Sequence, residues 1–224
     1  MIVPNVGFMP NAIITGGTRG LGLAFAAVLR DAGWDVVTDG RSESDQPGYV
    51  RGDITDPAHR AALIAAVPSL DLLMNNAGTL GPSPLPSVSS LSSAALRDLF
   101  ETNVVAPLAL TQLALPLLAA SHGVVINVTS DAAVEAYEGW GGYGASKSAL
   151  ERLGAVLGVE LGAANTEVAV WQVDPGDVRT RMHQDAYPGE DISDRPLPSE
   201  VAPALLGLLA KRPPSGRHRL ADYA

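Results

Sequence analysis

The chain has 224 residues, 46% of them hydrophobic, which suits one α/β domain with a sizeable core and leaves little room for a second domain. Its formal net charge of −9 argues against a nucleic-acid partner, because phosphate binding needs a concentrated basic surface. The sequence has no cysteine and four scattered histidines, so disulfides, thiolate catalysis and a bound metal are not expected.

Short apolar runs alternate along the chain with longer stretches whose apolar residues are spaced three or four apart. The runs cover residues 12–15, 35–38, 70–74, 123–128 and 167–173, and the helical stretches cover 21–32, 58–67, 91–119 and 142–161. This alternation predicts a Rossmann-type, doubly wound α/β fold: a mostly parallel sheet with helices on both faces, in a single domain over residues 1–224. A last edge strand is expected at 215–220. In such sheets the ligand lies beyond the carboxyl ends of the strands.

Two segments break this pattern and are predicted to be loops. Residues 81–90 hold three prolines and four serines, and lead into a helix capped by serine. Residues 174–199 hold four prolines and no clear periodicity. Because a loop that long in a compact domain is usually functional or disordered, residues 177–198 are predicted to form a short substrate lid.

A glycine-rich turn, Thr-Gly-Gly-Thr-Arg-Gly-Leu-Gly over residues 15–22, follows the first apolar run and opens a helix. Glycines there permit a tight turn and a close backbone approach to a diphosphate, which the helix N-terminus attracts. A plain strand-to-helix turn is the alternative, and the position after the first strand favours nucleotide binding.

From this turn onward the sequence resembles the short-chain dehydrogenase/reductase family, in its compact single-domain branch, over nearly the whole chain. The turn matches the family pattern Thr-Gly-x-x-x-Gly-x-Gly, and five further motifs follow in the family's order. They are Asn-Asn-Ala-Gly at 75–78, a helical asparagine at 103, a serine at 130, Tyr-x-x-x-Lys at 143–147, and Pro-Gly followed by threonine at 175–180. The resemblance implies reversible carbonyl reduction and alcohol oxidation by hydride transfer. It also implies that Asn103, Ser130, Tyr143 and Lys147 are catalytic.

These residue types suit the chemistry. Tyr143 and Lys147 are four residues apart in a helical stretch, so they share one face. Tyrosine is a poor base at neutral pH, and we expect the neighbouring ammonium to lower its pKa. Ser130 is expected to hydrogen-bond the substrate oxygen. By resemblance, Lys147 also donates to the ribose hydroxyls and Asn103 anchors a water that connects Lys147 to solvent.

A solvated helical Tyr–Lys pair is the alternative interpretation of this motif. The composition weighs against it, because the chain has 13 arginines and only two lysines, Lys147 and Lys211. Arginine is the usual cation of this sequence, and it cannot replace an amine that must be compact and whose pKa must be adjustable.

The cofactor is predicted to be NADP(H) rather than NAD(H). Proteins that bind NAD have an acidic residue at the end of the second strand, which binds the ribose hydroxyls. By resemblance that position falls on Gly40 in this chain, and Arg41 follows it. Arg19 is a second candidate for the 2′-phosphate. The competing interpretation makes Asp39 the ribose acid, displaced by one residue, and Arg41 a surface charge. Asp53 resembles the acid that meets the adenine amino group, whereas Asp56 suits a helix N-cap.

The residues expected to bind the cofactor include both Tyr143 and Lys147. The others are Gly16, Thr18, Arg19, Gly20, Leu21, Gly22, Arg41, Asp53, Ile54, Asn76, Ala77, Gly78, Pro175, Gly176, Val178 and Thr180.

The substrate is expected to be a small carbonyl compound or alcohol, bound by Ser130, Tyr143, Tyr137 and Trp140. Tyr137 and Trp140 lie where the family lines its pocket, and packing in the core is the equal alternative for both. The predicted lid contains Met182, His183 and Tyr187. A lid or surface role for His183 is favoured over proton donation.

Two glycines, Gly154 and Gly158, lie in the same helical stretch as the Tyr–Lys pair. Each costs about 1 kcal/mol relative to alanine, which predicts close packing there, against the rest of the chain or another subunit. By resemblance, a homodimer or homotetramer is expected.

A cytoplasmic location is expected. No apolar run is judged to reach the roughly 18 residues that span a bilayer, so no membrane partner is predicted. Residues 1–10 carry two prolines and no basic flank, unlike a signal peptide. The rival functions are a non-catalytic NADP(H)-sensing protein, which has no need of all four catalytic residues, and a sugar-nucleotide epimerase or dehydratase, which needs a larger C-terminal domain.

Overall fold

The computed structural model describes residues 9–224, so the expectation of no signal peptide falls largely outside the described residues. A seven-stranded, entirely parallel sheet runs through the centre in the order β3-β2-β1-β4-β5-β6-β7. Its strands are β1 Asn11–Ile14, β2 Asp35–Gly40, β3 Tyr49–Arg51, β4 Leu72–Asn75, β5 Val124–Val128, β6 Ala169–Asp174 and β7 Gly216–Arg219. The Rossmann-type fold predicted from the alternating pattern is confirmed.

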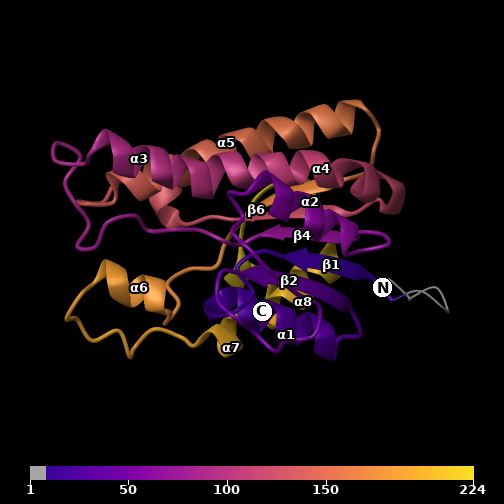
Figure 1. Cartoon of the computed structure of the whole chain (residues 1–224), viewed down its shortest axis with the longest axis horizontal. Coiled ribbons are helices and arrows are strands. Elements are labelled where there is room, and N and C mark those ends of the chain that lie inside the picture. Colours follow the sequence, from indigo (N-terminus) through magenta and orange to yellow (C-terminus); the bar gives the residue numbers. More distant parts are fainter. Residues whose placement is uncertain (1–8) are drawn as a thin grey trace.

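Helices cover both faces of the sheet (Figure 1). They are α1 Gly20–Asp31, α2 Pro57–Ala65, α3 Ser93–Phe100, α4 Ala106–Ser121, α5 Gly141–Ala163, α6 Arg181–Ala186, α7 Pro198–Val201 and α8 Ala204–Lys211. Short helical turns also occur: η1 Glu101–Val105 is π-helical, whereas η2 Asp131–Ala133 and η3 Leu220–Tyr223 are 3₁₀. Successive side chains of a strand point to opposite faces, so Ile13 packs with α2 and α4 while Ile14 packs with α1 and α8.

Several elements differ from the sequence-based expectations. Helix α6 and the start of α7 lie within residues 174–199, which were predicted to be a loop, because helices of 6 and 4 residues are too short to show a periodicity. Strand β3 was not predicted, because its three residues at the sheet edge are too few to show a pattern. Helix α8 was not predicted as a separate helix. The predicted helix 91–119 is a continuous run from α3 to α4 that changes to π-helical geometry at η1, which carries Asn103. Such π-helical turns are often found at functional sites.

Within the described residues, the helical run Ser93–Ser121 is long and apolar enough to cross a membrane by length and composition, with a mean hydropathy of 1.8. The expectation that no such segment exists is therefore wrong on these criteria. The run is weak evidence for a span, because the core helix of a water-soluble protein passes the same test. Here Leu110, Ala114 and Leu118 are fully buried in the core between the helix and the sheet.

Helix α5 lies against the sheet at its glycines. A Cβ on Gly154 would collide with the side-chain amide of Gln172 on β6, and a Cβ on Gly158 would lie 2.9 Å from Cβ of Ser215. The predicted close packing is present, and its partner is the sheet of the same chain rather than another subunit. This contact fixes how far α5, and the Tyr–Lys pair on it, stands from the strand ends.

We predict that Gly154→Ala lowers the free energy of unfolding by about 1–3 kcal/mol, because the added methyl group overpacks a buried contact. Gly162→Ala is the matched control in the same helix, since no atom lies within 4 Å of its added Cβ. This control should raise stability by up to about 1 kcal/mol through helix propensity. Urea denaturation measures both changes, and equal effects of the two substitutions would contradict the packing argument.

Candidate active site

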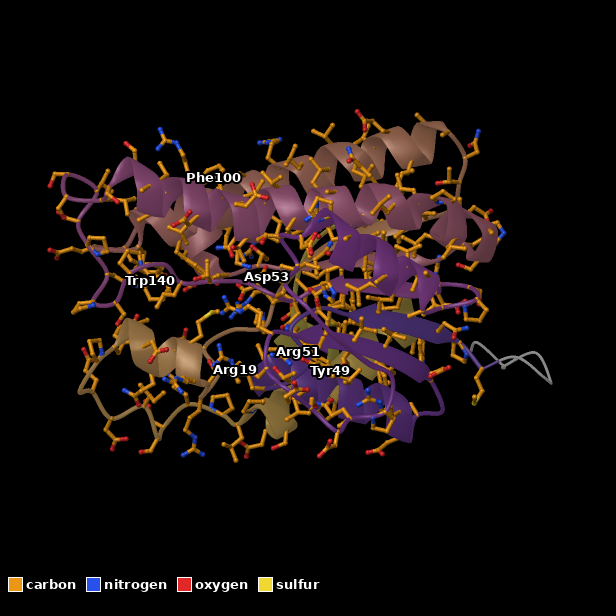
Figure 2. The ribbon with its side chains drawn as sticks, in the orientation of Figure 1. Arg19, Tyr49, Arg51, Asp53, Phe100 and Trp140 are labelled. Carbon is orange, nitrogen blue, oxygen red and sulfur yellow. The ribbon has the colours of Figure 1, made fainter. Side chains whose placement is uncertain are left out.

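A cavity of about 720 Å³ lies beyond the carboxyl ends of the strands. All the residues predicted to bind the cofactor line it, from the glycine-rich turn to Thr180. Ser130, Tyr137, Trp140 and Tyr143 line it too. In Figure 2, Trp140 lies toward α6 at one side, and Arg19 and Asp53 lie nearer the end of β2. The tertiary structure therefore brings together residues that are widely separated in sequence.

The glycine-rich turn is packed so tightly that side chains are excluded. A Cβ on Gly22 would collide with the carbonyl oxygen of Gly16, and a Cβ on Gly16 would lie 3.0 Å from Cα of Ala77. The N-cap residue of α1, Arg19, makes no capping hydrogen bond with its side chain. The first N–H groups of α1 therefore face the cavity without a side-chain partner, which suits an anionic ligand.

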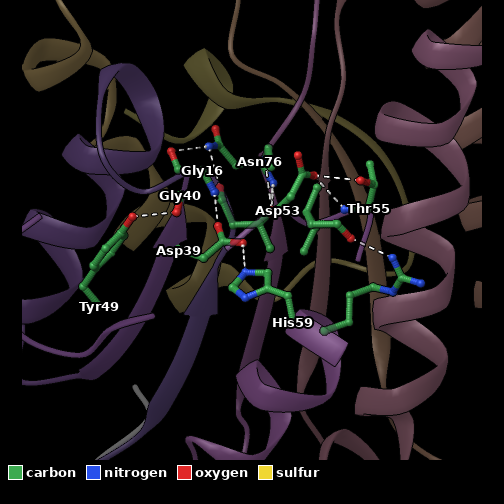
Figure 3. Close-up of polar contacts among 12 residues, drawn as sticks. Gly16, Asp39, Gly40, Tyr49, Asp53, Thr55, His59 and Asn76 are labelled. Carbon is green, nitrogen blue, oxygen red and sulfur yellow. Dashed lines mark hydrogen bonds and ion pairs between the residues drawn. The ribbon is translucent and has the colours of Figure 1, made fainter. Parts of the chain in front are cut away.

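A buried carboxylate holds this turn in place (Figure 3). The backbone N–H of Gly16 donates to Oδ1 of Asp39 at 2.6 Å, and Nε2 of His59 on α2 lies 2.9 Å from Oδ2. Asp39 is 2% exposed, and burial raises its pKa. Sequence reasoning missed His59. The only sequence signal was a histidine at a position that faces the sheet.

The neighbouring residues at the end of β2 shape the rim of this part of the cavity. A Cβ on Gly40 would lie 2.7 Å from Cγ2 of Thr18, so the turn already fills the space of a side chain there. Arg41 lines the cavity. Oδ1 of Asp53 accepts hydrogen bonds from the N–H and hydroxyl of Thr55, and these hydrogen bonds lower the pKa of Asp53. The predicted N-cap at Asp56 is confirmed, since its carboxylate accepts from the N–H of Ala58 at 2.9 Å.

Tyr143 and Lys147 lie one turn apart on α5, with Nζ of Lys147 5.6 Å from the centre of the tyrosine ring. Their exposed fractions are 9% and 4%. Nζ of Lys147 donates to the carbonyl oxygen of Val128 at the end of β5, at 2.8 Å. The predicted juxtaposition of the two side chains is present.

The prediction that the ammonium of Lys147 lowers the pKa of Tyr143 is wrong for this structure. Burial, followed by the charges of Asp131 and Asp174, raises the pKa of Tyr143, although the ammonium of Lys147 is close. Burial also lowers the pKa of Lys147 to about 8, so that the lysine is a weaker source of positive charge than an exposed one. Desolvation disfavours both charged forms, and here it outweighs their attraction. Tyr143 is a neutral phenol in this structure.

Asn103 lies behind the cavity rather than in its lining. Its Oδ1 accepts from the N–H of Thr79 at 2.8 Å, and its Nδ2 donates to the Thr79 carbonyl and to Oγ of Ser146. The side chain therefore clamps the loop after β4 to helix α5. Its water-anchoring role stays a prediction.

Ser130 lies just after β5 and caps η2, with its hydroxyl accepting from the N–H of Ala132. The same hydroxyl donates to Oδ1 of Asp131 at 2.9 Å, and Tyr137 donates to Oδ2 of Asp131 at 2.9 Å. Asp131 lines the cavity. Sequence reasoning missed this residue, although an acid directly after a candidate catalytic serine was visible.

Arg217 on β7 joins two parts of the site. It donates to the carboxylate of Asp174, to the carbonyl oxygen of Ser130 and to Glu151 on α5. Asp174 in turn accepts from the N–H of Gly176 at 2.9 Å. The predicted edge strand thus holds the loop after β6 against the serine, a role that no local sequence signal indicated.

Helix α6 lies in the segment predicted to be the lid. Thr180 caps it by accepting from the N–H of His183. The rings of Tyr143, Trp140, Tyr187 and His183 form a chain of neighbours, with centroid distances of 5.7, 5.9 and 5.1 Å. Met182 also lines the cavity. Within residues 9–224, no group of three or more His, Asp or Glu side chains is placed to hold a metal ion.

Comparison with known proteins agrees with this fold. Residues 10–191 match the family model described as short chain dehydrogenase. The chain is 33% identical to the serine 3-dehydrogenase of Agrobacterium fabrum, over 76% of this chain and 72% of that protein. A short chain dehydrogenase from Salmonella enterica serovar Typhi has a TM-score of 0.85 at 27% identity, covering 95% of this chain and 96% of the other. One from Shigella flexneri, complexed with NADP, has a TM-score of 0.84 at 27% identity, covering 94% and 95%.

Burying the charged amine of Lys147 in the site lowers the free energy of unfolding at neutral pH. The pKa of Lys147 is about 8 in the fold and near 10.5 unfolded, so below pH 8 both states bind the proton and the folded state carries the full desolvation cost. As the pH rises from 8 to 10.5, only the unfolded state keeps the proton, and this cost disappears. We expect Lys147→Met to raise the free energy of unfolding at pH 7 by about 1–2 kcal/mol, less than the full shift because the hydrogen bond to Val128 is also lost.

Denaturant unfolding at pH 7 and pH 10 measures this effect, and the gain should shrink at the higher pH. Lys211→Met is the control, since this exposed lysine is the only other one in the sequence. A Lys147→Met protein that is less stable than the wild type at pH 7 would contradict the argument.

Proposed function

The chain belongs to the short-chain dehydrogenase family, and we propose that it is an NADP(H)-dependent oxidoreductase that interconverts a carbonyl group and an alcohol. The observation that carries the proposal is the position of Tyr143, Lys147 and Ser130 in the same cavity as the glycine-rich turn. A nucleotide-binding end and a proton-donating end in one cavity are what hydride transfer to a carbonyl requires.

The residues present fit a dinucleotide. The N–H groups that begin α1 lack a side-chain cap, and the tightly packed glycines leave the backbone open to a diphosphate. Asp53 and Ile54 would bind the adenine end of the cofactor. Its middle would be bound by Asn76, Ala77 and Gly78. The loop from Pro175 to Thr180 would hold the nicotinamide end. The bound nicotinamide would supply or accept the hydride.

The protein's own part is to bind the substrate oxygen and exchange a proton with it. Tyr143 carries its proton, since burial raises its pKa, and so is set to donate it to a carbonyl oxygen. Ser130 would hydrogen-bond the same oxygen once its hydroxyl turns from Asp131. Lys147 would return a proton toward Tyr143 and bind the ribose hydroxyls. Asn103 positions the surrounding loop. A preference for NADP(H) favours reduction as the working direction.

The preference for NADP rests on the end of β2. Asp39 lines the cavity, but both of its carboxylate oxygens are already engaged by the protein, through Gly16 and His59, rather than left for a ribose diol. Thr18 fills the space in which an acid at position 40 would stand. Arg41 and Arg19 line the same end of the cavity and would bind the 2′-phosphate. The Shigella relative solved with NADP supports this choice.

The lid and the assembly complete the proposal. Residues 177–198, which include α6, would close over the substrate in the cytoplasm. A homodimer or homotetramer would form through the outer faces of α4 and α5. Apolar side chains are exposed there, including Leu113, Val156 and, at 74%, Val159.

We predict that Tyr143→Phe lowers kcat for carbonyl reduction by at least about 100-fold, because the proton donor is lost while the ring is kept. The assay follows the absorbance loss of NADPH with a panel of ketones and aldehydes. Tyr223→Phe, which removes a hydroxyl outside the cavity, is the matched control and should keep its activity. Full turnover by Tyr143→Phe would favour a protein that senses NADP(H) without chemistry.

We predict that Arg41→Ala lowers the ratio of kcat/KM for NADPH to that for NADH by about tenfold or more, because a charge-assisted contact to the 2′-phosphate is removed. Arg152→Ala, on the exposed side of α5, should leave the ratio as it is in the wild type. An unchanged ratio in Arg41→Ala would overturn the assignment of Arg41.

A further inference from the structure

The part of the cavity beyond Tyr143 carries a negative charge that has no ion-pair partner. The carboxylate of Asp131 lines the cavity directly beside Ser130. Within residues 9–224, no cationic side chain forms an ion pair with it. It accepts three hydrogen bonds, from Ser130, Ala132 and Tyr137. These hold the carboxylate in place and leave its charge uncompensated.

The cations of the cavity lie elsewhere or face away. Arg19 and Arg41 belong to the glycine-rich turn and the end of β2, and Lys147 donates to the carbonyl oxygen of Val128. The side chain of Arg181 is 78% exposed, and its Nε lies 3.8 Å from Oδ2 of Asp185, with which it forms an ion pair. The carboxylate of Asp177 also lines the cavity, and it forms an ion pair with Arg195. Arg195 itself does not line the cavity.

Three tyrosines at this end of the cavity respond to the charge of Asp131. The pKa of Tyr137 is raised mainly by its hydrogen bond to Asp131. The pKa values of Tyr143 and Tyr187 are raised first by burial, and the charge of Asp131 adds to both shifts. A ligand that brings a second negative charge here would be repelled, and a positive charge would be stabilised.

Aromatic rings form a wall of the cavity near this charge. Trp140 stands edge-on to Tyr143 and tilted against Tyr187, and the rings of Tyr187 and His183 are tilted by 40° with their centroids 5.1 Å apart. All four residues line the cavity. Aromatic faces combined with a carboxylate are how proteins bind amines and quaternary ammonium groups.

We propose that the substrate is a ketone, aldehyde or alcohol that also carries a cationic amine, bound by Asp131 and the aromatic wall of Trp140 and Tyr187. This inference rests on the proposed function for the reacting carbon and adds the chemical class of the group attached to it. Asp131 then serves two purposes: it holds Ser130 before the substrate arrives and binds the ammonium afterwards.

The test uses two alcohols of the same shape. Choline carries a trimethylammonium group, and its carbon isostere carries a tert-butyl group in the same place. Each is titrated by calorimetry into the protein saturated with NADPH, a combination in which an alcohol cannot react. We expect choline to bind about tenfold more tightly or better. Asp131→Asn should reduce this preference to about threefold or less, since the amide keeps the shape without the charge.

The matched control is Asp194→Asn, which removes a lid carboxylate that does not line the cavity and should leave the preference as it is. If Asp131→Asn fails to fold by circular dichroism, Tyr187→Leu provides the second variant. Loss of its ring should weaken choline binding several-fold more than binding of the isostere.

Three results would overturn the inference. Choline that binds no better than its isostere, or not at all, removes the proposed substrate class. Equal loss of both ligands in Asp131→Asn makes Asp131 a structural cap only. A changed ratio of NADP⁺ to NADPH affinity in Asp131→Asn, with the choline preference unchanged, shows that the carboxylate balances an oxidised nicotinamide instead. A protein that does not bind NADPH overturns the proposed function itself, and the two failures are thereby distinguished.

Discussion

The close approach of helix α5 to the sheet is the constraint on which the rest of the site depends. A Cβ on Gly144 would lie 2.5 Å from the carbonyl oxygen of Ala132, and Gly154 and Gly158 leave no more room further along the helix. Because the helix lies this close to the sheet, Nζ of Lys147 reaches the last carbonyl of β5 and Tyr143 faces the cavity. The same closeness removes both groups from water. Their pKa values follow from that burial rather than from their attraction to each other.

The two ends of the cavity are built on opposite electrostatic principles. At the nucleotide end, both carboxylate oxygens of Asp39 are held by the protein, through Gly16 of the glycine-rich turn and through His59. Backbone N–H groups without a side-chain cap and two arginines line this end, together with Asp53. At the other end, Asp131 faces the cavity without an ion-pair partner among the described residues. A ligand with phosphates at one end and positive charge near the other matches this division.

Two side chains outside the cavity lining, Arg217 and Asn103, hold the loops that form the cavity in position relative to one another. Arg217, on the last strand, bridges Asp174, Ser130 and Glu151, and so connects the loop after β6 with the serine and with α5. Asn103 does the same on the other side, between the loop after β4 and Ser146. Both act through side-chain hydrogen bonds, some to backbone groups and some to other side chains, which tie separate segments into one network.

The sequence by itself determined the class of fold, most of its strands and helices along the chain, and the residues that meet at the strand ends. It could do so because hydrophobic periodicity and glycine spacing are local, and because a parallel sheet brings all its carboxyl ends to one edge. Only the tertiary structure decided that Asp39 faces inward onto Gly16, that Gly154 packs on Gln172 rather than on another subunit, and that burial governs the pKa of Tyr143. Those outcomes depend on partners such as His59 and Asp131, whose side chains are brought to the site by distances and degrees of burial that no local pattern encodes.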